Sequence, residues 1–164
     1  MDRERLIKKR KALQAKLQIA DCLSRIDELI QYLNEHEVKY RIHVKCEKVL
    51  EALLAYPTNF SGLNWAHIPN SQKVAYCSVN ERNKIISATV THNLKKSDTV
   101  FIVWGDGNKP TLEMSAELEM SAEFAAENSG VMAAQDFDMW ILNLEKGFCL
   151  EHYHEGYVAW VLAS

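Results

Sequence analysis

The densest group of reactive side chains is the segment Cys149–Glu155, which reads Cys-Leu-Glu-His-Tyr-His-Glu. On a strand, alternate residues share a face, so His152 and His154 would point together. The opposite face would carry Cys149, Glu151, Tyr153 and Glu155. Two histidines can give zinc two ligands, but a site needs a third and usually a fourth. The remaining histidines are isolated in the sequence: His36, His43, His67 and His92. We therefore predict no metal site and no cofactor, with a small metal-dependent enzyme built on His152 and His154 as the alternative.

Sequence motifs of the common enzyme classes are absent. The chain has no GxSxG, no Walker A sequence and no GxGxxG. The HExxH pattern of zinc proteases and the PCxxC pattern of zinc deaminases are missing as well. Gly105-Asp106-Gly107 lies in an expected hairpin turn, not between a strand and a long helix, so it is no phosphate-binding loop. We predict that the protein is not an enzyme and has no catalytic residues.

The two charge signs are separated along the chain. Residues 1–97 carry 17 Lys or Arg and 10 Asp or Glu, a net charge of +7. Residues 98–164 carry 2 basic residues, Lys109 and Lys146, and 12 acidic ones, a net charge of −10. The electric field of such a charge separation can steer an oppositely charged partner. A simpler explanation of the separation is that the helical half is Lys-rich and the sheet half is Glu-rich.

The chain opens with the basic segment Arg3–Lys11, the one feature that favours nucleic-acid binding. The sequence as a whole is acidic, with a net charge of −3, and lacks the basic footprint of a nucleic-acid-binding domain. We expect a solvated helix end here and no nucleic-acid partner.

The first half is predicted to be mainly helical. Apolar residues recur at steps of three and four over residues 2–35 without Gly or Pro, which predicts one long helix, and oligomerisation through it is a further alternative function. A second helix is expected over 38–55, ended by Pro57. Residues 58–70 read as a loop pinned by Phe60, Leu63, Trp65 and Ile68. From Ser71 or Asn80 to Thr91 a third helix is expected, with a strand as the alternative.

The second half is predicted to be mainly sheet. Thr99–Trp104 is a run of strand-forming residues, followed by a Gly-rich turn at 105–110 and a return segment from Thr111. Three further strands separated by tight turns predict an antiparallel meander: Asp138–Asn143, Phe148–His154 and Tyr157–Leu162.

A six-residue sequence, Leu-Glu-Met-Ser-Ala-Glu, occurs twice in succession over residues 112–123. Its alternation favours a strand, whereas its residue types favour a helix. We expect a strand in the first copy and a helix from Ser115 or Ser121 to Asn128, closed by Gly130.

Helices first and strands afterwards predict an α+β fold, with N-terminal helices packed on a C-terminal antiparallel sheet in a single domain over 1–164. No apolar stretch resembles a signal peptide or a membrane span, so we expect a cytoplasmic protein without a membrane partner. The four cysteines are scattered and without a CxxC pair, which favours reduced, separately buried thiols.

Carboxylates and aromatic residues occur together in the second half. Asp136, Asp138, Glu151 and Glu155 stand near Trp104, Trp140, Tyr153, Tyr157 and Trp160. Aromatic residues are the usual content of a sheet core, but aromatic anchors rimmed by carboxylates also bind basic partners.

The segments Asp136–Asn143 and Gly147–Gly156 resemble the C-terminal sheet of small bacterial immunity proteins, which protect cells from polymorphic toxins, including those of contact-dependent growth inhibition. The resemblance extends over about residues 98–158, and residues 1–97 do not share it. It implies a bacterial immunity protein that binds a cognate toxin, expected to be a basic nuclease, and occludes its surface. The residues expected to contact the toxin are Asp106, Glu113, Glu117, Asp136, Asp138, Trp140, Glu151, Tyr153, Glu155 and Tyr157.

Overall fold

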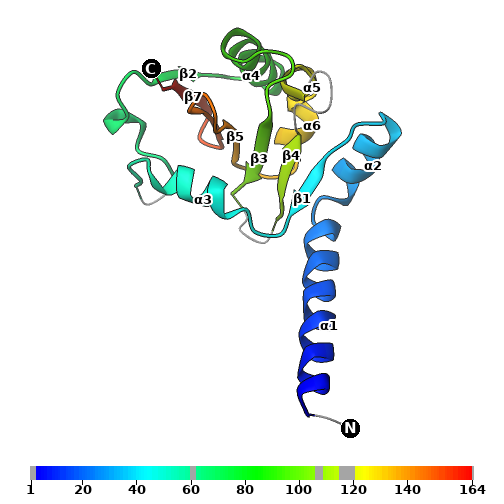
Figure 1. Cartoon of the computed structure of the whole chain (residues 1–164). Helices are drawn as coiled ribbons and strands as arrows, with labels where there is room; N and C mark the ends of the chain where they lie inside the picture. Colours follow the sequence, from blue (N-terminus) through cyan, green and yellow to red (C-terminus); the bar gives the residue numbers. More distant parts are fainter. Residues whose placement is uncertain (1–2, 60–61, 106–108, 115–120, 164) are drawn as a thin grey trace.

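The computed structural model describes residues 3–59, 62–105, 109–114 and 121–163. In this part of the chain one antiparallel sheet has the strand order β1-β4-β3-β5-β6-β7-β2 (Figure 1). Its strands are β1 (Arg41–His43), β2 (Gln72–Ala75), β3 (Val100–Trp104), β4 (Thr111–Met114), β5 (Met139–Asn143), β6 (Phe148–Tyr153) and β7 (Tyr157–Leu162). The helices are α1 (Arg3–Ser24), α2 (Asp27–Glu35), α3 (Glu47–Leu54), α4 (Val79–Asn93), α5 (Ser121–Glu127) and α6 (Ser129–Ala133), with a short 3₁₀ helix, η1 (Trp65–His67). The predicted α+β fold is confirmed.

Both faces of the sheet are covered. On one face, α2, α4, α5 and α6 form a core with the sheet, in which Leu29, Ile86 and Met132 meet Ile102 and Leu150. On the other face, α3 and the segment around η1 form a second core with Phe101, Leu142 and Cys149. Because successive strand residues point to opposite faces, a strand with helices on both sides is buried along its whole length, as β6 is.

The predicted meander is present as β5, β6 and β7, which pair in sequence. Its two turns contain Gly147 and Gly156, whose φ angles of 60° and 93° lie where L-residues are strained. The strand expected to reach His154 ends at Tyr153, because the turn closes there with a hydrogen bond from the Gly156 amide to the Tyr153 carbonyl.

The prediction of one helix over 38–55 is wrong at its start. Glu37 has a φ of 55°, and the chain then runs extended into β1, where Ile42 pairs with Leu112 of β4. Val38, Tyr40 and Ile42 all pack against the first core, so apolar residues alternate with polar ones here. This period of two was present in the sequence, but the longer helical pattern that follows it masked it.

The segment after Ser71 contains both of the expected structures. Gln72–Ala75 forms edge strand β2, paired with β7, and α4 follows. The Ser78 side chain accepts a hydrogen bond from the amide of Glu81, an N-cap that fixes the start of α4 close to the predicted Asn80. Of the residues expected to pin the preceding loop, Leu63, Trp65 and Ile68 are buried, and Phe60 lies outside the described residues.

The repeated segment is partly described. Its first copy begins in β4 as expected, residues 115–120 lie outside the described residues, and α5 begins at Ser121. Gly130 does not close this helix, since it lies inside the next one, α6. Asp106 to Asn108 of the expected hairpin turn also lie outside the described residues.

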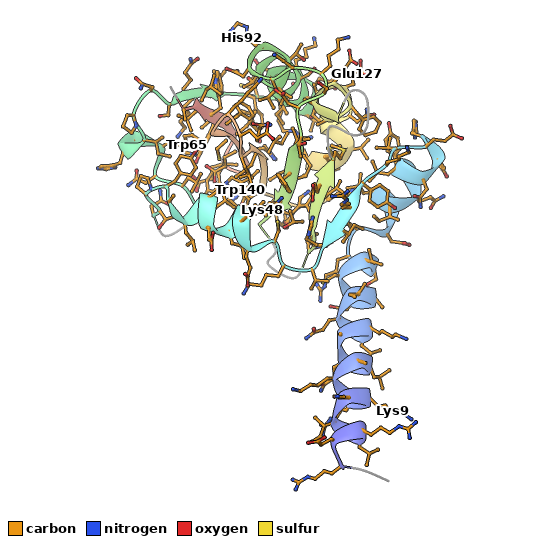
Figure 2. All side chains as sticks on the ribbon, viewed as in Figure 1. Lys9, Lys48, Trp65, His92, Glu127 and Trp140 are labelled. Atoms are coloured by element: carbon orange, nitrogen blue, oxygen red, sulfur yellow. The ribbon has the colours of Figure 1, made fainter. Side chains whose placement is uncertain are left out.

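The single helix expected over residues 2–35 is interrupted at Arg25 and Ile26, which separate α1 from α2. α2 packs into the first core through Leu29 and Leu33, whereas α1 projects away from the sheet (Figure 1). Cys22 is the one buried residue of α1. Other side chains of α1, such as Lys9, extend from the helix into solvent (Figure 2). Cys46 and Cys149 are also buried, but Cys77 is exposed, which corrects the expectation of four buried thiols.

Candidate functional site

Three connections of the sheet lie together at one end of its strands: the one after β3, the one before β5 and the one after β6. The amide of Gly105 donates to the carbonyl of Asp138 at 3.0 Å, which joins the end of β3 to the start of β5. Lys109 Nζ lies 3.2 Å from Asp136 Oδ2, and the amide of His154 donates to Asp138 Oδ1 at 2.9 Å. We call this region, consisting of Gly105, Lys109, residues 134–138 and residues 154–156, the Phe137 end.

Phe137 is the most exposed large hydrophobic residue at this end, with 78% of its surface accessible. The carboxylates on both sides of it are held in place: Asp136 by Lys109 and Asp138 by His154. Asp136 Oδ1 also accepts a hydrogen bond from the Phe137 amide at 2.7 Å. The Phe137 ring lies edge-on to the His154 ring, with centroids 6.4 Å apart. An exposed aromatic side chain is thus presented on a fixed loop.

Asp138 orients the His154 ring. Its Oδ1 accepts from both the amide and the Nδ1 of His154, each at 2.9 Å, which places the ring proton on Nδ1. The hydrogen bond to this carboxylate raises the pKa of His154 above its ordinary value. His154 is therefore a surface histidine biased toward its charged form.

Two tyrosines lie behind this loop. The Tyr153 ring is buried and contacts the rings of His154 and Tyr157, at centroid distances of 4.4 Å and 5.0 Å. Lys73 Nζ lies 3.7 Å from the centroid of the Tyr157 ring. Burial, followed by the charge of Glu151, raises the pKa of Tyr157 well above its ordinary value. Tyr153 therefore supports the loop from inside, and Tyr157 is half-buried beside it.

A cavity of about 550 Å³ opens beside Phe137. Its polar lining includes Tyr76, Arg82, Lys109, Asp136, His152 and His154. His152 is 3% exposed, and its Nε2 lies 2.8 Å from the Tyr76 hydroxyl oxygen. Burial, helped by the positive charge of Arg82, lowers the pKa of His152 to about 4, so this ring is neutral near pH 7. Tyr76 and Arg82 were not predicted, because nothing in the sequence connects them to residues some seventy positions later.

His152 and His154 both line this cavity, but they are engaged separately, one by Tyr76 and the other by Asp138. Within the described residues, no group of three or more His, Cys, Asp or Glu side chains is arranged to hold a metal ion. This part of the chain therefore offers no set of metal ligands for the alternative function as a metal-dependent enzyme.

Three further predicted contact residues, Glu113, Trp140 and Glu151, do not belong to the Phe137 end. Glu113 is buried near the far edge of the sheet, where its Oε2 lies 2.5 Å from His43 Nε2. Glu151 is completely buried and accepts a hydrogen bond from the Trp65 indole N–H. Trp140 is paired with Glu151 across the sheet and packs in the second core. Asp106 and Glu117 lie outside the described residues.

The acidic surplus of the second half is partly compensated inside the fold. Its carboxylates with basic partners are Asp98 with Lys146, Glu113 with His43 and Arg41, Glu123 with Lys96, Asp136 with Lys109, and Asp138 with His154. Glu155 is exposed at the Phe137 end, and Glu127 and Glu145 are exposed elsewhere. The described surface therefore carries less negative charge than the sequence suggests.

Two comparisons with other proteins yielded nothing: no protein-family model matches the chain, and no curated protein is significantly similar to it. The resemblance to immunity proteins therefore stays a prediction. None of the described helices combines the length and hydrophobicity needed to cross a bilayer.

Proposed function

We propose that this protein is a bacterial immunity protein, acting in the cytoplasm, that binds a cognate toxin through the Phe137 end and performs no catalysis of its own. The observation that carries the proposal is the exposure of Phe137 between two fixed carboxylates. Aromatic side chains dominate the energetics of protein interfaces when they fill a pocket of the partner. A large exposed aromatic residue on an anchored loop is suited to that role.

The surroundings of Phe137 favour a basic partner. Asp136 and Asp138 flank the ring, and Glu155 is exposed in the adjacent turn. Their hydrogen bonds within the chain preorganise the rim, so little conformational entropy is lost on binding. Because Lys109 and His154 already offset two of these charges, the carboxylates contribute more to orientation and encounter rate than to affinity. A basic toxin surface with an apolar recess fits this arrangement.

The test uses the product of the neighbouring upstream gene, since immunity genes commonly follow their toxin genes. The chain should bind that product in a pull-down and protect cells that express it. Phe137→Ala should weaken binding by at least 2 kcal/mol, about thirtyfold, as expected for a central aromatic anchor. Leu54→Ala is the matched control, because Leu54 is 77% exposed on α3 and is not part of the Phe137 end. Unchanged protection by Phe137→Ala, or equal loss with both variants, would count against the proposal.

A second candidate function rests on α1. This helix exposes apolar side chains that nothing in the described part of the chain covers: Leu6, Ile7, Leu13, Leu17 and Ile19. Exposed apolar residues along a projecting helix are typical of a surface that meets a partner. Self-association of two copies through α1 would bury them, and this role is compatible with toxin binding at the Phe137 end, which shares no residue with α1.

A further inference from the structure

The cavity beside Phe137 contains an arginine, Arg82, that forms no ion pair with any residue the structure describes. Arg82 lies on the first turns of α4 and is half-buried, and its Nε donates to the side-chain oxygen of its neighbour Asn83 at 3.0 Å. In the part of the chain that the structure describes, no carboxylate pairs with its guanidinium group. Its positive charge nevertheless acts on the cavity, because it adds to the effect of burial in lowering the pKa of His152 and opposes the rise that burial causes in the pKa of Tyr76. A half-buried cation lining a cavity is a candidate site for an anion.

We propose that this cavity binds a small organic acid, whose carboxylate pairs with the guanidinium group of Arg82. The inference does not rest on toxin binding, although the cavity shares Lys109, Asp136, Phe137 and His154 with the Phe137 end.

The charges around the cavity favour a monoanion. The cationic side chains of its wall are Arg82, Lys109 and His154, and the carboxylates that offset them are Asp136 and Asp138. Among these five described side chains, the positive charges outnumber the negative ones by one when His154 is protonated, which its raised pKa favours. A planar carboxylate can accept two parallel hydrogen bonds from a guanidinium group, whereas a phosphate dianion would be repelled by the two aspartates.

The size and the apolar part of the cavity indicate what is attached to the carboxylate. A volume of about 550 Å³ is within the range of small-molecule sites. Ala133, Ala134 and the exposed ring of Phe137 supply the apolar part of its lining. A carboxylate on a small ring or short aliphatic body matches this combination, and benzoate is a suitable probe.

Binding should be visible at His152. The groups that act on this imidazole are the hydroxyl of Tyr76, the guanidinium of Arg82, the carboxylate of Asp138 and the ring of His154. A carboxylate paired with Arg82 would offset one cause of the low pKa of His152 and add a negative charge nearby. An opposite charge within about 4–6 Å shifts a pKa by about one unit or more, so the pKa of His152 should rise on binding.

The experiment is a titration of the full chain with sodium benzoate at constant ionic strength, followed by NMR of the histidine rings and backbone amides. Benzamide is the neutral isostere. We expect saturable shifts at cavity residues and a rise of about one unit in the pKa of His152 with benzoate, and neither effect with benzamide. Shifts that do not saturate, or equal shifts with benzamide, would overturn the proposal.

Two variants locate the anion. Arg82→Gln should weaken benzoate binding about tenfold or more, because a charge-assisted hydrogen bond is lost. Lys84→Gln removes one positive charge from the same helix at an exposed position outside the cavity, and it should leave binding unchanged. Equal weakening by both variants would show a long-range charge effect and contradict the site. If Arg82→Gln does not fold, the comparison of benzoate with benzamide on the unaltered chain still tests whether the cavity binds a carboxylate. A negative result would leave toxin binding by the Phe137 end untouched.

Discussion

The indole N–H of Trp65 donates a hydrogen bond to the carboxylate of Glu151, and both side chains are buried. The amide of Leu63 lies 3.5 Å from the other oxygen of the same carboxylate. A loop of the first half is thereby fastened to β6 of the second. Burial raises the pKa of Glu151 above its ordinary value, and the hydrogen bonds from Trp65 and Leu63 offset only part of this effect.

The first prediction concerns Glu151. Its folded-state pKa is raised, so its contribution to stability is present below the unfolded pKa of about 4.5 and is lost as pH rises through the folded value. Glu151→Gln should remove this loss of stability with rising pH, and the variant should be at least as stable as the natural chain at pH 7. Glu151→Ala should be about 1–3 kcal/mol less stable than Glu151→Gln, because only glutamine keeps an acceptor for Trp65.

Urea unfolding of the three proteins between pH 4 and 8 checks this. Equal stability of the alanine and glutamine variants would show that the hydrogen bonds contribute nothing. An unchanged pH slope in Glu151→Gln would assign the slope to another group.

The second prediction concerns the acid limb of stability. The pKa of His152 is lowered from 6.5 to about 4, so its contribution is full above pH 6.5 and is lost as pH falls toward 4. At 1.36 kcal/mol per unit, this amounts to about 3 kcal/mol. His152→Gln should remove this part of the pH dependence of the unfolding free energy between pH 6.5 and 4. His154→Gln serves as the control, because the raised pKa of His154 gives a contribution of opposite sign, lost as pH rises.

Thermal or urea unfolding from pH 7 to 4 measures both variants, and NMR titration of His152 gives the pKa directly. A His152 that titrates near 6.5 in the folded chain would refute the prediction.

The third prediction concerns the turn between β5 and β6. Gly147 has a φ of 60°, and a Cβ added to it would lie 2.5 Å from the Cβ of Ala163. Gly147→Ala should therefore lose about 1–2 kcal/mol from backbone strain, and more from the steric contact. Ala163→Gly should restore the steric part only. A double-mutant cycle by urea unfolding measures this coupling, and strict additivity of the two substitutions would exclude the contact.

The fourth prediction concerns α1. If two copies associate through it, Leu13→Lys combined with Leu17→Lys should abolish a concentration-dependent dimer, as measured by light scattering. The melting temperature should stay unchanged, since these side chains are 59% and 61% exposed. Leu54→Lys adds a charge at a still more exposed position of α3 and should leave the dimer intact. A natural chain that is monomeric at every concentration would dismiss self-association.

The strands β5, β6 and β7 of the second half were predictable because Gly-containing segments of the sequence separate them, and these segments form turns in the structure. Gly147 and Gly156 adopt the positive φ angles that the turns require, so local chemistry and tertiary structure agree there. The strand β1 was missed because its three residues gain their stability from pairing with β4, about seventy positions later. Short edge strands depend on such distant contacts more than on their own residue types.

The candidate site was predictable only in part. Asp136 and Asp138 are two positions apart in the sequence, and the turn that contains Glu155 is brought to them by the hydrogen bond from the His154 amide to Asp138. Phe137 stands between the two aspartates, and this Asp-Phe-Asp pattern after a helix was the available signal that it is exposed. The buried positions of Glu113 and Glu151 follow from strand pairing and from Trp65, which residue type alone does not reveal.

The outermost strands of the sheet, β1 and β2, both come from the first half of the chain, while the five strands between them come from the second. A fragment that begins near residue 98 would expose the backbone groups of β4 and β7 along two unpaired edges and would be prone to aggregate. Closing those edges requires contacts between residues about 70 and 85 positions apart, which predicts slow folding. The basic and acidic halves thus contribute strands to one sheet, and during synthesis the strands of the acidic half stay unpaired at both edges until β1 and β2 pair with them.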